Sequence, residues 1–208
     1  MTDETSSEAS VSTRERLLDA ARTLFGEKGY AGTSTREIAA SADCNVALIS
    51  HYFGSKEGLL RALLMEGMGQ LTAELSKIAE QEADPEKRLR RIVRFLVGHF
   101  AENHAGMRMM HRELLRTDSP LLNELAPGTA AYHGIFVEIL EQARKEGRLR
   151  DVDPNVATLL LMGMLQIYFV AYPLASRILG PLSPELLDAL ETHVTEIFFH
   201  GVLAEGGG

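Results

Sequence analysis

Residues 34–53, which read STREIAASADCNVALISHYF, are the most informative stretch for the fold. They contain two helix-length segments, 35–42 and 46–53, joined by about three residues. Ser34 and Glu37 form the S/T-x-x-E pattern of a capping box, which marks the start of the first segment. Each segment is too short to be stable alone, and a longer amphipathic segment, 12–28, precedes them. The sequence therefore predicts a helix-turn-helix braced by a third helix.

The rest of the chain carries the same helical signals. Ser12 and Glu15 form a second capping box, and four further capping residues each precede a proline suited to a first helical turn: Asp84, Ser119, Asp153 and Ser183. Apolar residues recur at helical spacing, and no segment shows the alternation of a strand. We expect an all-α protein of about nine helices, which span residues 12–28, 35–42, 46–53, 56–81, 85–103, 107–116, 120–146, 154–179 and 184–203.

The charge of the chain is distributed unevenly. The 208 residues have a formal net charge of −8, which taken alone argues against a nucleic-acid-binding protein. Residues 11–61, however, carry a net charge of +1, whereas residues 1–10 carry −3 and residues 62–208 carry −6. The acidity thus lies outside the helix-turn-helix, whose basic side chains can approach phosphates if they share a face.

Composition and termini favour a soluble, cytoplasmic protein. Hydrophobic residues make up 45% and charged residues 24% of the chain, which is typical of a globular fold. Cys44 is the single cysteine, so an intramolecular disulfide and a Cys-based zinc finger are excluded. Residues 1–11 contain no apolar run that would indicate secretion, and we expect them to form a disordered acidic tail. Residues 205–208 are expected to form a flexible tail.

The segment 46–53 has an unusual outward face. Ile49 and Phe53 fall together on the core side of a helical wheel. The outward and flanking positions hold Ala47, Leu48, Ser50, His51 and Tyr52. A small surface helix is one interpretation, but outward leucine and tyrosine side chains suit a DNA major groove, where thymine presents a methyl group.

Two strings of residues carry a resemblance to a known family. Residues 29–40 read GYAGTSTREIAA, and residues 45–59 read NVALISHYFGSKEGL. At this spacing they resemble the TetR/AcrR family of bacterial one-component regulators, over about residues 12–61, and residues 62–208 agree with that family in length and helix content. The resemblance implies a transcriptional repressor that binds DNA as a homodimer. It also implies a divergent C-terminal helical domain that binds a small-molecule inducer.

The resemblance and the outward face together indicate which residues contact DNA. They are Thr35, Arg36, Asn45, Val46, Ala47, Leu48, Ser50, His51, Tyr52 and Lys56. Arg36 and Lys56 would neutralise phosphates. Asn45 either caps the recognition helix or lies beside a phosphate at its N-terminus. Leu48 and Ser50 depart from the common family pattern, so the operator sequence is not predicted.

Signals for other chemistry are weak. His99, His104 and His111 lack the spacing of metal ligands, and residues 67–69 lack the strand and the further glycine of a dinucleotide-binding loop. We expect no metal, no cofactor and no enzymatic activity, with a helical enzyme as the alternative. Three arginines on one helix face are interpreted as a solvated surface, with an anion-binding wall as the alternative: Arg108, Arg112 and Arg116.

Residues 155–176 contain no charged side chain. A helix that is apolar on all sides must be buried on all sides, so one side should face its own core and the other a second copy of the chain. Together with the helix over 184–203, this predicts a four-helix dimer interface, with a membrane-inserted segment as the alternative. A twofold dimer in turn implies a palindromic operator.

The C-terminal region concentrates methionine and aromatic residues, which fill cores and also line adaptable apolar pockets. We expect a small, largely apolar ligand there, bound by Phe100, Met107, Met110, His111, Tyr132, Phe136, Met162, Gln166, Tyr168 and Phe169. A regulator that acts without a small-molecule ligand is the alternative.

One predicted helix, 56–81, connects the two expected domains. Residues 12–55 form the helix-turn-helix DNA-binding domain, and residues 56–204 form the helical effector-binding and dimerisation domain. Gly67 and Gly69 lie inside the connecting helix, where glycine lowers helix stability. They indicate either a hinge or the close packing of a neighbouring helix.

Overall fold

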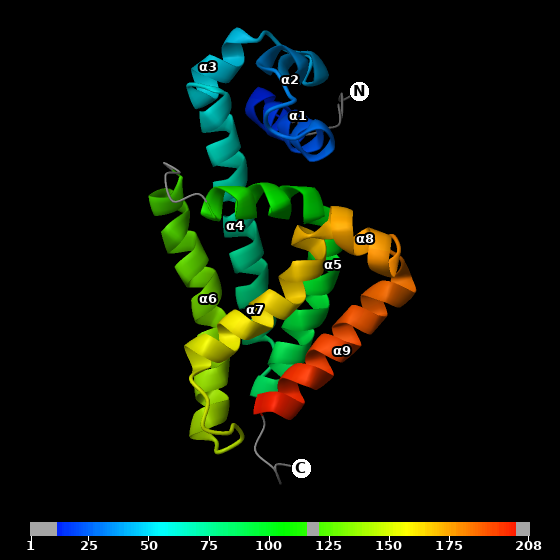
Figure 1. The fold of residues 1–208 in the computed structure, drawn as a ribbon. Helices are drawn as coiled ribbons and strands as arrows, with labels where there is room; N and C mark the ends of the chain where they lie inside the picture. Colours follow the sequence, from blue (N-terminus) through cyan, green and yellow to red (C-terminus); the bar gives the residue numbers. More distant parts are fainter. Residues whose placement is uncertain (1–11, 116–120, 203–208) are drawn as a thin grey trace, which may run out of the picture. The chain divides into compact units, whose positions relative to one another are not determined.

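A computed structural model describes residues 12–115 and 121–202. The predicted tails, 1–11 and 205–208, lie outside these residues. The described chain is all-α without a strand, as predicted, and contains nine helices (Figure 1). They are α1 (Thr13–Lys28), α2 (Thr35–Ser41), α3 (Ala47–Phe53), α4 (Lys56–Glu80), α5 (Pro85–Leu114), α6 (Leu122–Lys145), α7 (Pro154–Val170), α8 (Tyr172–Leu179) and α9 (Pro184–Val202).

The predicted capping residues are confirmed where they are described. Both capping boxes are present, since Ser12 and Ser34 each accept the backbone N–H three residues on and Glu15 and Glu37 bond back to the capping residue. Side-chain oxygens also cap the starts of α5, α7 and α9, from Asp84, Asp153 and Ser183. Ser119 lies outside the described residues.

Two predicted helix boundaries are wrong. The predicted helices 85–103 and 107–116 form one helix, α5, whose ribbon changes direction along its length (Figure 1). Asn103 has a non-helical backbone (φ −114°, ψ 18°), and its side-chain amide donates to the His99 carbonyl at 2.9 Å. The predicted single helix 154–179 is instead α7 and α8, which are bent by 82°. The bend lies beside Pro173, which has no backbone N–H and clashes with a preceding helical turn.

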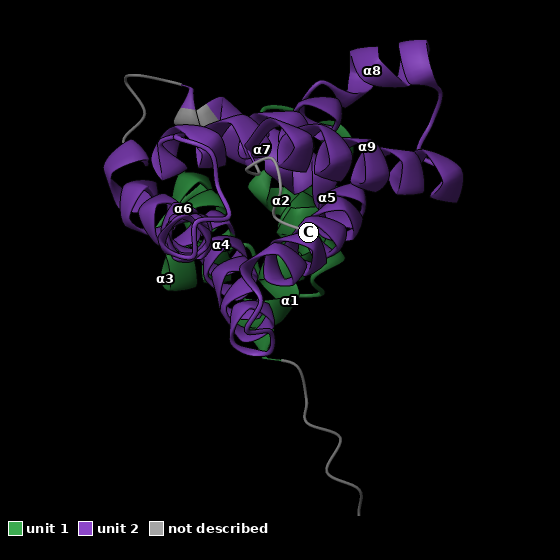
Figure 2. Ribbon diagram, turned by 90° about the horizontal axis from the view of Figure 1, so that it is seen from below, with its two compact units in different colours: residues 1–63 green, residues 64–208 purple. Residues whose placement is uncertain are grey.

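The chain divides into two compact units, coloured separately in Figure 2. Unit 1 is Met1–Leu63 and unit 2 is Leu64–Gly208, so the division falls inside α4. The core of unit 1 is made of buried residues from α1 to α4, which include Leu17, Ala21, Phe25, Ile38, Ile49, Leu59 and Leu60. In unit 2, α5 packs against α6, α7 and α9 around fully buried Leu96, Phe136, Leu161 and Phe169.

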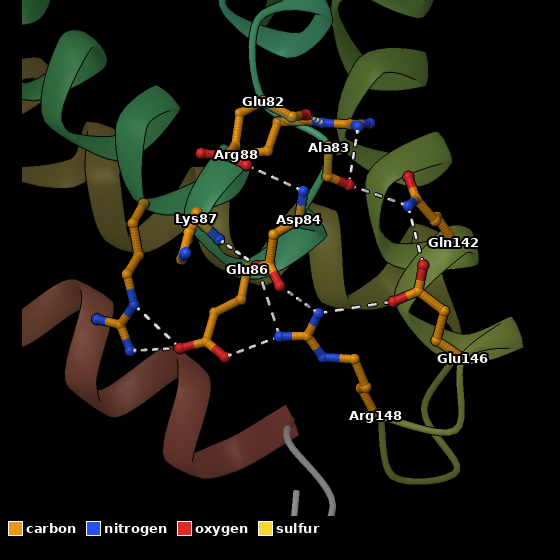
Figure 3. Close-up of polar contacts among 10 residues, drawn as sticks. Glu82, Ala83, Asp84, Glu86, Lys87, Arg88, Gln142, Glu146 and Arg148 are labelled. Atoms are coloured by element: carbon orange, nitrogen blue, oxygen red, sulfur yellow. Dashed lines mark hydrogen bonds and ion pairs between the residues drawn. The ribbon is translucent and has the colours of Figure 1, made fainter. Parts of the chain in front are cut away.

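A charged network fixes the start of α5 within unit 2 (Figure 3). The Arg148 guanidinium donates to Asp84 at 2.7 Å and to Glu86 at 3.3 Å. Gln142 donates to the Ala83 carbonyl at 3.2 Å. The bond from Arg148, with that from the Lys87 backbone, lowers the pKa of Asp84 below its ordinary value of 3.8. The network joins the start of α5 to the end of α6, far from the break at Asn103.

Candidate functional site

The helix-turn-helix of unit 1 is held together by polar contacts on either side of the turn into α2. The buried Thr33 hydroxyl donates to the carbonyls of Leu24 at 3.1 Å and Gly29 at 2.9 Å. Lys28 pairs with Glu37 at 2.7 Å, which joins the end of α1 to the first turn of α2. The bond from Lys28, together with those from Ser34, lowers the pKa of Glu37 from 4.5 to about 2. These contacts orient α2, on which α3 packs.

The face of α3 largely matches the predicted wheel. Ile49 is buried, as predicted, while Phe53 is half-buried and lies under the Arg14 guanidinium at 5.5 Å from its ring centroid. Leu48, predicted on the outward face, is half-buried. The exposed positions are Ala47, Ser50, His51 and Tyr52. They form a small-residue and aromatic surface on the second helix of the motif.

The start of α3 is capped by the Asn45 side chain, one of the two roles predicted for it, although Asn45 lies one residue before the N-cap position. Val46 is the N-cap residue by backbone geometry and makes no side-chain cap bond. Asn45, one residue earlier, accepts the Ala47 N–H through Oδ1 at 2.8 Å. Asp43, in the turn before it, has φ of 49°, which aspartate tolerates better than most residues. Capping is thus the contact that Asn45 makes in this structure.

Lys56, a predicted phosphate contact, is bound within unit 1. Its ammonium donates to the Tyr30 carbonyl and lies 4.1 Å from the centroid of the Tyr30 ring and 5.8 Å from that of Phe25. Partial burial lowers the pKa of Lys56 below its ordinary value. An ammonium has three N–H donors, so the bond to Tyr30 leaves donors for another acceptor. Lys56 therefore joins the start of α4 to the turn after α1, a contact that no sequence pattern signalled.

The ten predicted DNA contacts all lie on α2, α3, the turn between them and the first residue of α4. Seven are exposed: Arg36, Asn45, Val46, Ala47, Ser50, His51 and Tyr52. The other three are half-buried: Thr35, Leu48 and Lys56. An exposed helix with short and aromatic side chains, preceded by an exposed arginine, has the form that enters a major groove.

The ten predicted ligand contacts all lie in unit 2. Six belong to its buried core: Phe100, Tyr132, Phe136, Met162, Tyr168 and Phe169. Met107 and Met110 pack against that core from the second segment of α5, and His111 and Gln166 are half-buried. The structure thus brings these residues together around one apolar region formed by α5, α6 and α7.

Three polar side chains connect the helices of this apolar region. His111 of α5 lies with Nε2 at 2.8 Å from Gln166 Oε1 of α7, and with Nδ1 at 3.0 Å from the Met107 carbonyl. The Tyr132 hydroxyl of α6 donates to the Met162 sulfur at 3.0 Å, and burial raises the pKa of Tyr132 while its bond with Gln166 opposes that rise. Gln166 therefore links α5 to α6, and a ligand that enters this region meets a small polar group among apolar walls.

The arginine face of α5 is not uniformly solvated, which corrects that interpretation for one residue. Arg112 is exposed, but Arg108 is half-buried and its Nη1 atom is buried without a hydrogen-bond partner among the described residues. Arg116 lies outside the described residues.

The two glycines inside α4 do not serve close packing, so that interpretation is wrong. A Cβ atom built at Gly67 or Gly69 would meet nothing within 4 Å. The close approach is at Gly128 of α6 instead, where a Cβ would lie 2.9 Å from Met68 Cγ. The hinge hypothesis for α4 stays a prediction.

An apolar surface is left uncovered on α7, α8 and α9. Leu159 and Ile167 of α7 and Ile197 of α9 are 67%, 62% and 63% exposed. Between α7 and α9 lies a groove of about 340 Å³, lined by Met164, Ile167, Leu186, Ala189, Leu190, His193, Val194 and Ile197. The short helix α8 fully buries none of its residues, although Tyr172 and Ala175 pack in part against the core.

Two further questions are whether a helix could cross a membrane and whether side chains are grouped to bind a metal ion. Over residues 12–115 and 121–202, no helix alone is long and apolar enough to cross a bilayer, although the bent pair α7 and α8 together has the length and composition for it. The same residues contain no group of three histidine, cysteine, aspartate or glutamate side chains placed to hold a metal ion.

A fixed helix-turn-helix with an exposed second helix defines a DNA-binding protein. Residues 17–63 match the family described as "Bacterial regulatory proteins, tetR family", and residues 82–169 match "Tetracyclin repressor-like, C-terminal domain". The chain is 34% identical over 172 residues, 77% of its length and 81% of the relative's, to the probable HTH-type transcriptional regulator YttP of Bacillus subtilis. The chain belongs to the tetR family and is a DNA-binding transcriptional regulator.

Solved structures share the fold. The regulator FadR of Bacillus subtilis, solved in complex with stearoyl-CoA, superposes with a TM-score of 0.76 at 22% identity, over 89% of this chain and 97% of FadR. The regulator AibR, solved with isovaleryl coenzyme A and operator DNA, superposes with a TM-score of 0.74 at 23% identity, over 90% of this chain and 98% of AibR.

Proposed function

We propose that the protein is a dimeric repressor that binds a palindromic operator through α3 and releases it when an apolar ligand enters the core of unit 2. The observation that carries the DNA-binding part is the exposed face of α3, held in a fixed helix-turn-helix whose sequence belongs to the tetR family. In this proposal residues 12–55 bind DNA and residues 56–204 bind the ligand and a second copy.

Each element of the helix-turn-helix has a role in DNA binding. Arg36, exposed on α2, neutralises a phosphate, and the exposed Ser50, His51 and Tyr52 reach base edges or backbone from α3. Asn45 keeps the first N–H groups of α3 oriented. Lys56 positions the start of α4 through Tyr30 and offers its remaining donors to a phosphate.

Dimerisation is supported by the uncovered surface of α7. Val156, Leu160, Gly163 and Ile167 recur at helical spacing along one side of this helix, and all four are exposed. A Cβ at Gly163 would meet nothing within 4 Å, so another helix can approach closely there. Contiguous apolar surface of this kind marks interaction sites. A second copy, paired through α7 and α9, covers it and gives the twofold symmetry that a palindromic operator requires.

Ligand binding is supported by the apolar region around Tyr132 and Gln166. Its aromatic and methionine walls adapt to apolar groups, and Gln166 and His111 offer hydrogen bonds to one polar group. Because FadR and AibR were solved with coenzyme A thioesters, acyl thioesters are the first ligands to test.

Selection of random duplex DNA on the purified protein tests this function. We expect enrichment of a near-palindrome, with retardation of the selected DNA that weakens as salt rises. Ligand release is then tested by adding acyl-CoA thioesters of graded chain length to the retarded complex. Enrichment of no sequence, or of a site without twofold symmetry, would overturn the proposal.

A further inference from the structure

One guanidinium nitrogen in unit 2 is buried without a partner, although its residue, Arg108, is half-buried. The Nη1 atom of Arg108 is buried and makes no hydrogen bond, and it is the one such side-chain atom among the side chains that the structure describes. A guanidinium is always charged, and a buried charged donor without a partner is costly to the folded state. No described carboxylate lies within hydrogen-bond distance of this nitrogen.

Arg108 lies in the segment of α5 that reaches the predicted ligand region. This segment begins after the break at Asn103, and Met107 and Met110 pack from it against the buried core. His111, one turn beyond Arg108, bonds with Gln166 of α7. Arg112 lies on the same segment but is exposed to water. The segment therefore carries a half-buried cation, one nitrogen of which is excluded from water, among residues that pack against the apolar core.

We infer that Arg108 is the anchor for an anionic group, carboxylate or phosphate, on a ligand whose remaining body is apolar. Carboxylates and phosphates accept two parallel N–H bonds from a guanidinium, and such bonds are stronger than those to a neutral acceptor. Nη1 is buried from surface water and has no protein partner among the described residues, so a ligand group that reaches it satisfies a donor that the chain leaves unpaired. This inference rests on the proposed ligand binding in unit 2 and names the class of ligand.

A pair of fluorescent probes with one skeleton tests the inference without DNA. 1-Anilinonaphthalene-8-sulfonate is an apolar aromatic anion, and N-phenyl-1-naphthylamine is the same body without the charge. Each is titrated into the wild-type protein and into the variants Arg108→Gln and Arg112→Gln. The second variant is the matched control, because it removes the same charge from an exposed position on the same helix.

We expect Arg108→Gln to weaken binding of the sulfonate by about tenfold or more and to leave binding of the neutral probe unchanged. Unchanged binding of the neutral probe also shows that the variant is folded. Arg112→Gln should behave as the wild type with both probes, and Arg108→Lys should retain part of the sulfonate affinity. Wild-type sulfonate affinity in Arg108→Gln, or no sulfonate binding by the wild type, would overturn the inference.

Competition separates the two sources of the anion. Displacement of the bound sulfonate by laurate assigns the anchor to a carboxylate, and displacement by lauroyl-CoA alone assigns it to the phosphates of coenzyme A. Because no step uses DNA, failure of the repressor proposal shows in the DNA selection, whereas failure of the anion anchor shows only in these titrations.

Discussion

At the scale of single residues, the two predicted phosphate contacts differ in what else they do. Arg36 is exposed on α2, whereas the Lys56 ammonium is bonded to Tyr30 and lies against its ring. We expect Arg36→Ala to weaken binding to all DNA sequences alike and to lower the salt slope by about one, with an unchanged melting temperature. Lys56→Ala should do the same and also lower the free energy of unfolding by about 1 kcal/mol.

Retardation assays over a range of salt concentrations, with thermal denaturation of each variant, check this difference. If Lys56→Ala melts at the wild-type temperature, the contacts with Tyr30 contribute nothing to stability and Lys56 serves DNA alone. If Arg36→Ala leaves the salt slope unchanged, Arg36 does not contact phosphate.

Glu37 makes unit 1 sensitive to acid. Its pKa is lowered from 4.5 to about 2 by the bonds from Lys28 and Ser34, so the ionised form is favoured in the folded state. A lowered pKa contributes stability that is present above about pH 4.5 and is lost as the pH falls from there towards 2. The melting temperature of the wild type should therefore exceed that of Glu37→Gln near neutral pH, with the gap closing over this range.

Melting curves of both proteins from pH 7 to pH 2 measure that gap. Lys28→Met is the informative companion, because it removes the largest cause of the lowered Glu37 pKa. In the Lys28→Met background, Glu37→Gln should therefore lower the melting temperature by less than it does in the wild type. A constant difference between wild type and Glu37→Gln at every pH would mean that the glutamate acts by shape and not by charge.

At the scale of elements, α4 contributes residues to both units, and its glycines allow the helix to be made more stable by substitution. Gly67 and Gly69 each have open space where a methyl group would lie, so alanine at either position should fit without a clash. Each substitution should raise the free energy of unfolding by up to about 1 kcal/mol, since alanine favours helix more than glycine does.

The same double variant tests the hinge hypothesis. If α4 bends at these glycines, the double variant has a stiffer helix. Ligand binding should then change the affinity for operator DNA by a smaller factor than in the wild type, whereas the affinity for operator DNA without ligand should be unchanged. Gly58→Ala is the contrasting control, because its Cβ would collide with the Phe53 carbonyl and should destabilise unit 1. Ligand release at the wild-type concentration in the double variant would contradict the hinge.

At the scale of the whole molecule, the proposed dimer interface on α7 can be tested by placing a charge on it. Ile167→Glu places a charge in the middle of the exposed apolar stripe and should yield a monomer at micromolar concentration with much weaker operator binding. Leu115→Glu is the matched control, since Leu115 is 78% exposed and belongs to neither α7 nor α9. A dimer places its recognition helices roughly 34–36 Å apart, one turn of DNA.

Sedimentation of the two variants beside the wild type provides the measurement. A wild-type monomer, or an Ile167→Glu dimer as stable as the wild-type dimer, would show that the stripe is not the interface. A monomeric Leu115→Glu would show that the charge disrupts the fold at large and that α7 is not the cause.

The all-α class, the helix-turn-helix and the helix starts marked by capping residues could all be predicted from the sequence. These features are local: a capping box joins residues three apart, and helical spacing repeats within a few turns, so both can be read along the chain. The family strings are local too, which is why residues 29–59 sufficed to indicate a tetR-type regulator.

What each side chain does with its neighbours emerges only from the folded chain. The bond from Lys56 to Tyr30, the link between His111 and Gln166 and the burial of Arg108 all depend on which helices come to lie together. Helical periodicity gives the direction of a side chain around its own axis, but the partner across the interface lies tens of residues away. Long-range packing fixes that partner, and no spacing along the chain encodes it.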